Sequence, residues 1–416
     1  MSPLRVLRAF RKAEYAELAA LFFLQLMAVA IWMVPLSLVF ATHNLRGLAP
    51  YAFAASAFAT FVSPLIFGAM ADRHASPVKV LRGLAAASAA AMALFAWSVQ
   101  QGWPPGVVLA VVQIYALCAA PTGSIITAIV FSRLENSQRE YGPVRAGATV
   151  GWMAGCWLVS LLNADASTLA GFTSAAVWLL LAAFTFLLPG VPPPKPAGHP
   201  TLLQRLGWDA LVLLKNHDHR VVFITVALFS IPLAAFYPFT PLHLQALGFK
   251  HVSAWMTLGQ TTELVAMFAL AGLFLRWRLK WIFAAGLGFG VLRFALCALN
   301  GRAWLLAGTT LHGLSYTLYF ITAQIYIDER VGAEWRARAQ ALMTLMTNGV
   351  GNLIGYLSTG WWFAACARPS GMQWSLFWGV LSAAVAAVLV YFLVAYHGQG
   401  VGMKRAKEIK IDVQNL

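Results

Sequence analysis

The sequence predicts an all-α membrane protein with twelve transmembrane helices arranged as two halves of six. Of its 416 residues, 60% are hydrophobic and only 10% are charged, against roughly 25% charged in an average soluble protein. Apolar runs of about 18 residues or more recur along the chain, and each can cross a ~30 Å hydrocarbon core as a helix. One long polar stretch near the middle divides these runs into two equal groups.

The apolar runs are predicted as helices because lipid offers the backbone no hydrogen-bond partners, which excludes open strands. The predicted spans are 16–42, 49–70, 78–100, 105–130, 143–163, 167–188, 219–246, 252–275, 279–299, 303–326, 335–362 and 372–397.

The polar stretch at 189–220 begins with a proline-rich, semi-rigid segment. Residues 201–215 have apolar side chains at helical spacing, which predicts a short amphipathic helix on the membrane surface. The chain therefore divides into an N-terminal six-helix half, a cytoplasmic linker, a C-terminal six-helix half and a cytoplasmic tail. These regions are predicted at 1–188, 189–218, 219–400 and 401–416.

The basic residues predict the orientation in the membrane. With the N-terminus in the cytoplasm, 24 of the 29 Lys and Arg residues fall on the cytoplasmic side. The opposite side carries only Arg46, Lys250, Arg302 and Arg368. This asymmetry follows the positive-inside rule and predicts a multi-pass protein of the cell (inner) membrane with both termini in the cytoplasm. The net charge of +15 thus indicates orientation and contact with anionic lipid, and no nucleic-acid partner is expected.

Two six-helix halves joined by a cytoplasmic linker are the architecture of the major facilitator transporters, whose substrate site lies near mid-membrane between the halves. The loop "GAMADRHASPVKVLR" contains Gly68, Asp72 and Arg73 and resembles the superfamily's Gly-x-x-x-Asp-Arg signature. In that signature the acid and the bases latch helix ends on the cytoplasmic side. Ala75 replaces the usual glycine, and an ordinary basic loop is the alternative interpretation.

Small residues predict close helix packing. Gly147, Gly151 and Gly155 are spaced by four residues, as are Gly351 and Gly355. Such faces let helix backbones approach closely in lipid. They would serve plain bundle packing or, in a transporter with rocking halves, a sliding interface.

Six prolines within the predicted spans indicate helix breaks. A proline leaves a backbone carbonyl without its helical hydrogen bond, and lipid cannot replace that bond, so these breaks are expected to line a cavity. These prolines are Pro35, Pro64, Pro121, Pro232, Pro238 and Pro241.

Glu263 is the only carboxylate well inside any predicted span. An ionisable group at the bilayer centre costs at least ~2.5–3.5 kcal/mol on insertion scales, so it normally faces a cavity or a partner. Gln260 lies three residues earlier and shares its helix face. A Glu–Arg pair that merely ties two helices together is the structural alternative.

On the fifth span, Arg145, Thr149 and Trp152 are spaced i, i+4 and i+7 and share a second polar face. Arg293 stands alone among apolar neighbours and is interpreted as structural. His243 and His312 could relay protons, although hydrogen-bonded packing histidines are the favoured interpretation.

Several blocks of the sequence resemble the nucleoside:proton symporters of the major facilitator superfamily, in matching order and spacing. They are "GPVRAGATVGWMAGCWLVS" (142–160), "WDALVLLKN" (208–216), "GQTTELV" (259–265), "LRFALCALNG" (292–301) and "ARAQALMTLMTNGVGN" (337–352). The resemblance implies that Arg145, Thr149, Gln260 and Glu263 line a nucleoside site, with Trp152 at an aromatic position there.

The chain departs from this family pattern at half of the implied site. Leu233 and Phe236 replace polar amides in the seventh span. Thr317 replaces an aspartate in the tenth span, with Tyr316 beside it and His312 one turn earlier. These replacements change the hydrogen-bonding groups of the implied nucleoside site. They therefore bear on specificity for nucleosides, whereas the prediction of a transporter does not depend on them.

The resulting expectation is a secondary transporter that imports a nucleoside or a similar polar, ring-bearing metabolite with protons by alternating access. The alternatives are a sugar or oligosaccharide:proton symporter and an exporter of amphiphiles. An enzyme is not expected because no H-E-x-x-H or comparable constellation occurs. Cofactors and metals are not expected either, and the chain is expected to be a monomer.

Glu263 is expected to carry the coupling proton, with His312 next in line. The solute-binding set is expected to comprise Arg145, Thr149, Trp152, Gln260, Glu263, Tyr316, Thr317 and Tyr319.

Overall fold

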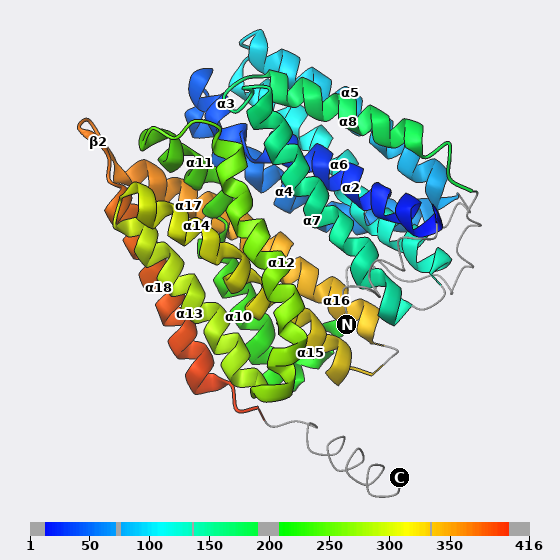
Figure 1. Ribbon diagram of the computed structural model, residues 1–416, viewed down its shortest axis with the longest axis vertical. Coiled ribbons are helices and arrows are strands. Elements are labelled where there is room, and N and C mark those ends of the chain that lie inside the picture. Colours follow the sequence, from blue (N-terminus) through cyan, green and yellow to red (C-terminus); the bar gives the residue numbers. More distant parts are fainter. Residues whose placement is uncertain (1–12, 72–75, 135–136, 190–207, 333–334, 399–416) are drawn as a thin grey trace, which may run out of the picture.

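The computed structural model describes residues 13–71, 76–134, 137–189, 208–332 and 335–398. Its helices form two bundles that lie side by side in Figure 1, one from each half of the chain. The N-terminal bundle contains α2 (Ala13–Met33), α3 (Leu36–Thr42), η1 (Arg46–Leu48), α4 (Ala49–Ala71), α5 (Pro77–Gln100), α6 (Pro105–Arg133), α7 (Ser137–Leu161) and α8 (Leu169–Phe184).

The C-terminal bundle is built in a similar way, but more of its helices are interrupted. It contains η2 (Trp208–Lys215), α10 (His217–Leu233), α11 (Phe236–Ala246), α12 (Val252–Arg276), α13 (Leu279–Ala298), α14 (Arg302–Tyr316), η3 (Thr317–Ile321), α15 (Thr322–Arg330), α16 (Arg336–Thr344), η4 (Leu345–Gly351), α17 (Asn352–Cys366) and α18 (Trp374–Ala395). A two-residue antiparallel hairpin, β1 (Ala367–Arg368) with β2 (Gly371–Met372), joins α17 to α18.

The helices overlap the twelve predicted ranges. Within the described residues, six helical stretches are long and apolar enough to cross a membrane. They are Glu14–Thr42, Pro77–Gln100, Pro105–Arg133, His217–Ala246, Leu279–Ala298 and Trp374–Ala395. Membrane crossing by the remaining helices stays a prediction.

The packing order repeats from one half to the other. Helix α2 packs against α7 and α8, and α10, six spans later, packs against α17 and α18. Helix α5 packs against α6 and α8 in the same way as α13 packs against α14 and α18. The halves meet where α4 packs against α17 and where α7 packs against α12. The chain therefore consists of two similarly built bundles with an interface between them.

The glycine faces pack within each half. A Cβ built on Gly151 would lie 2.2 Å from the carbonyl oxygen of Phe23, so α7 touches the backbone of α2. A Cβ built on Gly355 would lie 2.6 Å from the Cβ of Ala234, where the seventh and eleventh spans meet. The expected bundle packing is therefore confirmed, and these faces do not form an interface between the halves. They hold equivalent helix pairs together inside each bundle.

Gly151→Ala is expected to destabilise the folded protein by about 1–3 kcal/mol, because overpacking forces the α2 and α7 backbones apart. Gly142→Ala is a matched control in the same helix, since a Cβ there meets nothing within 4 Å. Thermal unfolding in detergent should give a lower Tm for Gly151→Ala and no loss for Gly142→Ala. Equal Tm values would contradict the close contact.

Two spans are broken at equivalent places. The first span is interrupted at Pro35, between α2 and α3. The seventh is interrupted after Pro232, between α10 and α11. Pro121, in contrast, lies inside the continuous helix α6. The tenth and eleventh spans each contain a π-helical segment, η3 and η4, a feature that often accompanies functional sites.

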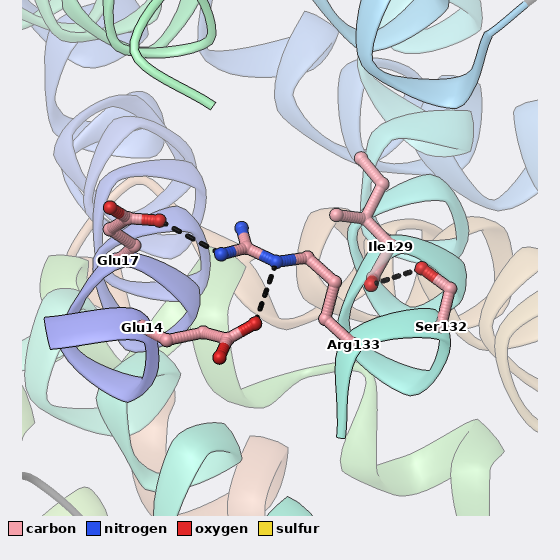
Figure 2. A network of polar contacts seen from close by, with 5 residues as sticks. All are labelled: Glu14, Glu17, Ile129, Ser132 and Arg133. Carbon is pink, nitrogen blue, oxygen red and sulfur yellow. Dashed lines mark hydrogen bonds and ion pairs between the residues drawn. The ribbon is translucent and has the colours of Figure 1, made fainter. Parts of the chain in front are cut away.

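At the cytoplasmic end predicted from the charges, Arg133 of α6 ties α6 to the start of α2 (Figure 2). Its Nε donates to Glu14 Oε1 at 3.2 Å and its Nη2 donates to Glu17 Oε2 at 3.0 Å. Because both carboxylates are partly exposed, this network contributes more to geometry than to stability.

Parts of the linker and of the loop motif lie outside the described residues. These parts are 190–207, with the first half of the predicted surface helix, together with Asp72 and Arg73. Gly68 lies in α4. Residues 208–215 form the 3₁₀ helix η2, and some of its apolar side chains pack against the core of the C-terminal half.

Candidate functional site

The two predicted polar faces come together at the interface of the halves. Arg145, Thr149 and Trp152 lie on α7, whereas Gln260 and Glu263 lie on α12. Helices α7 and α12 pack against each other. The interface therefore brings together the polar side chains that the sequence places in two separate spans.

Tyr237 connects the two faces. Gln260 Nε2 donates a hydrogen bond to the Tyr237 hydroxyl at 3.1 Å. The ring of Trp152 lies 5.3 Å from the ring of Tyr237, with the planes inclined by 55°. Tyr237 was not among the predicted site residues, although it follows Phe236 directly and lies between Pro232 and Pro238. The proline-broken helix was the signal that could have found it.

Arg145 and Glu263 are close enough to interact through their charges, as are Glu263 and the phenols of Tyr237 and Tyr316. Among the described residues, however, neither Arg145 nor Glu263 forms a side-chain ion pair within 4.0 Å. The guanidinium of Arg145 lies 5.4 Å from the ring of Phe22 on α2. This conformation therefore does not support a Glu–Arg pair that ties two helices directly.

The backbone at Glu263 is held tightly against α14. A Cβ built on Gly313 would lie 2.0 Å from the backbone nitrogen of Glu263, so only glycine allows this approach. Thr317 is fully buried, and its hydroxyl donates a long hydrogen bond of 3.5 Å to the Glu263 carbonyl. The prediction that Thr317 binds solute is therefore not supported, because its side chain faces the backbone of α12.

Two buried polar atoms next to Tyr237 have no hydrogen-bond partner among the residues that the structure describes. They are Nε1 of Trp152, a donor, and Oε1 of Gln260, an acceptor. Gln260 is only 4% exposed. Leaving such groups unpaired costs roughly 1–3 kcal/mol each, so the arrangement favours a polar ligand that would pair with both.

His312 is paired with Arg293. The distance between Arg293 Nη1 and His312 Nδ1 is 2.6 Å, and both residues are buried. Since a guanidinium only donates hydrogen bonds, Nδ1 must accept and His312 is neutral here. Phe236 stacks on the imidazole at 4.0 Å. This geometry does not support His312 as a proton carrier.

Arg293 itself is 1% exposed. Its guanidinium lies 4.5 Å from the ring of Phe236 and 4.7 Å from that of Phe294. Arg293 is therefore held by buried neighbours of its own half, in agreement with the interpretation of Arg293 as structural.

Tyr316 and Tyr319, both in the expected solute-binding set, have different surroundings. Tyr316 is half-buried, near the charges of Glu263 and Arg145. Tyr319 is fully buried and packs against Phe229 and Phe283 in the core of the C-terminal half. This geometry does not support Tyr319 as a solute-binding residue in this conformation, because its ring is enclosed in that core.

His243 is a packing histidine. Trp378 Nε1 donates to its Nδ1 at 2.9 Å, and its Nε2 lies 2.8 Å from Asn300 Oδ1. Both ring nitrogens are satisfied in one neutral tautomer, which agrees with the favoured sequence interpretation.

The sequence profile of the nucleoside H+ symporter family matches residues 13–400. The chain belongs to this family. Its members are transporters rather than enzymes. Relatives in Escherichia coli (strain K12) match along almost their whole length. The putative nucleoside transporter YegT is 32% identical over 401 residues, which cover 92% of this chain and 93% of YegT. The nucleoside permease NupG is 25% identical over 404 residues, which cover 91% and 94% of the two chains.

Solved structures of family members and of more distant transporters share the fold. The crystal structure of NupG matches with a TM-score of 0.81 at 24% identity and covers 92% of this chain and 98% of NupG. The POT family transporter PepTSo matches with a TM-score of 0.71 at 12% identity and covers 93% and 99% of the two chains. These similarities confirm the predicted major facilitator fold of this nucleoside H+ symporter family member.

Proposed function

We propose that this chain imports a nucleoside together with protons, and that the solute binds where α7, α11 and α12 meet. The unpaired donor of Trp152 and the unpaired acceptor of Gln260 carry this proposal, because a nucleobase edge presents both kinds of partner. Family membership favours nucleosides over the sugar symporter and the amphiphile exporter considered as alternatives.

Each side chain has a distinct role in the proposed site. The rings of Trp152 and Tyr237, with Tyr316 nearby, supply flat apolar surface for a base. Arg145 and Thr149 offer donors from α7 to ring or ribose oxygens. Gln260 and Glu263 offer acceptors from α12. Both halves therefore contribute to one binding site.

Glu263 carries the coupling proton in this proposal. Its charge interacts with Arg145 on the opposite half. A rearrangement of the halves that changes their separation therefore changes the free-energy cost of keeping the carboxylate ionised. Proton binding and solute binding at one site would then depend on each other.

Uptake by vesicles containing the purified protein tests this function. A panel of labelled nucleosides and sugars should give accumulation of at least one nucleoside and of no sugar when an inward proton gradient is imposed. Accumulation of a sugar in place of every nucleoside would contradict the assignment. Efflux of amphiphiles without nucleoside uptake would also contradict it.

We further propose a monomer in the inner membrane with both termini in the cytoplasm, since one chain supplies both halves of the site. Reporter fusions after Asn216 and at the C-terminus should both give a cytoplasmic signal. A periplasmic signal from either fusion would contradict this orientation.

A further inference from the structure

The N-terminus of α12 lies at the end of the bundle assigned above to the outside. The first N–H groups of a helix have no partner within the helix. His251 occupies the N-cap position in a left-handed conformation, with φ of 54°, and its side chain does not cap the helix. The His251 carbonyl oxygen accepts a hydrogen bond from Ala254 N at 3.1 Å, whereas Ser253 N must find its acceptor outside the helix.

The acceptors come from the other half of the molecule. Asp165 Oδ1 accepts a hydrogen bond from Ser253 N at 2.6 Å. Ser160 Oγ accepts one from Ala254 N at 3.0 Å and donates to Asp165 Oδ1 at 3.3 Å. His251 Nδ1 lies 3.0 Å from the Ser160 carbonyl oxygen. Side chains that follow or end α7 therefore cap a helix of the C-terminal half.

One further bond joins the same two helices deeper in the interface. Trp157 Nε1 donates to Thr257 Oγ1 at 3.2 Å. The outer ends of α7 and α12 are thus joined by a set of polar contacts, and these two helices are closed against each other at this end.

We propose that Asp165 and Ser160 form a latch that stabilises the closed outer end of the transporter. A carboxylate at a helix N-terminus is favoured by the helix dipole, and a short charge-assisted hydrogen bond is stronger than a neutral one. The outer ends of α7 and α12 separate when the halves rock open to the outside. The caps are then lost, so they favour the closed state over the open one.

This inference goes beyond solute recognition, because none of these residues belongs to the proposed binding site. It rests on the proposed orientation and on alternating access. Its test needs neither a substrate nor a proton gradient, so its failure is distinguishable from failure of the nucleoside assignment.

The segment between α7 and α8 provides a matched control. Ser167 Oγ accepts a hydrogen bond from Leu169 N at 3.2 Å, within the N-terminal half. Ser160→Ala and Ser167→Ala each remove one serine cap, but only Ser160→Ala removes a cap that crosses the halves.

Distances between the outer ends report on the latch. Spin labels on unnatural amino acids at Gln101 and Arg368, which are exposed on the two halves, leave the four native cysteines in place. Double electron–electron resonance is measured on the full chain in lipid nanodiscs without solute. Asp165→Ala should raise the ratio of long to short distances roughly tenfold, the factor expected for one charge-assisted hydrogen bond.

The other variants should shift the distances in proportion to the interaction that each one removes. Asp165→Asn keeps an acceptor but loses the charge, so it should give a smaller shift than Asp165→Ala. Ser160→Ala should also open the outer end, and Ser167→Ala should leave the distances unchanged. If Asp165→Ala does not fold, Asp165→Asn and Ser160→Ala decide the question. Unchanged distances in the folded Asp165 and Ser160 variants, or an equal shift in Ser167→Ala, would overturn the latch.

Discussion

Glu263→Gln is expected to abolish accumulation of solute against a gradient and to leave exchange of solute across the membrane intact. Glutamine keeps the size of the side chain and one acceptor oxygen but cannot bind or release a proton. With one proton per solute and one pH unit across the membrane, wild-type accumulation is limited to roughly tenfold, whereas the variant should only equilibrate. Exchange between preloaded and external solute should persist with a flatter pH dependence.

Glu329→Gln is a suitable control, since Glu329 is exposed near the end of α15 and should behave like wild type. Accumulation by Glu263→Gln would place proton coupling at another residue. Loss of folded protein together with exchange would instead indicate a structural role for Glu263.

Arg145→Ala is expected to lower transport by roughly tenfold to a hundredfold, the range given by loss of one hydrogen bond to a charged group. The folded protein should remain in the membrane, because the guanidinium forms no ion pair within 4.0 Å among the described residues. Arg145→Lys should restore little of this loss, since an ammonium cannot reproduce the planar two-pronged contact of a guanidinium. Initial uptake rates and membrane abundance are measured together.

Lys215 provides the control for charge alone, because it is an exposed basic residue at the end of η2. Lys215→Ala should transport like wild type. If Arg145→Ala also transports like wild type, Arg145 contributes only to orientation in the membrane. If Arg145→Lys restores full transport, transport requires the positive charge and does not require the planar two-pronged contact of the guanidinium.

Much of the fold could be predicted because the bilayer imposes strong rules on sequence. Apolar length predicts the helices, and basic residues predict their direction. The partners of each helix could not be predicted in the same way, since a small-residue face fits several neighbours. The glycines of α7 therefore predicted close packing without identifying the neighbour, which for Gly151 is Phe23 of α2.

The polar faces of α7 and α12 were predictable, because helical spacing determines which residues share a face. Any regular helix brings residues spaced by three or by seven positions onto one face, as with Gln260 and Glu263 or with Arg145 and Trp152. The tenth span is different, because its candidates Thr317 and Tyr319 do not come from helical spacing. A π segment begins at Thr317 and changes the helical register there, so regular spacing does not predict which way these two side chains face. Tyr237 was missed because a broken helix carries no periodic pattern.

Proton movement driven by solute alone tests the central claim most directly. Vesicles containing the purified protein and a pH-sensitive dye in the lumen receive a transported nucleoside outside, without an imposed proton gradient. Downhill entry of the nucleoside should acidify the lumen in wild type, because protons enter with the solute, and should leave the pH unchanged in Glu263→Gln. Nucleoside entry into wild-type vesicles without acidification would contradict proton-coupled transport by this chain.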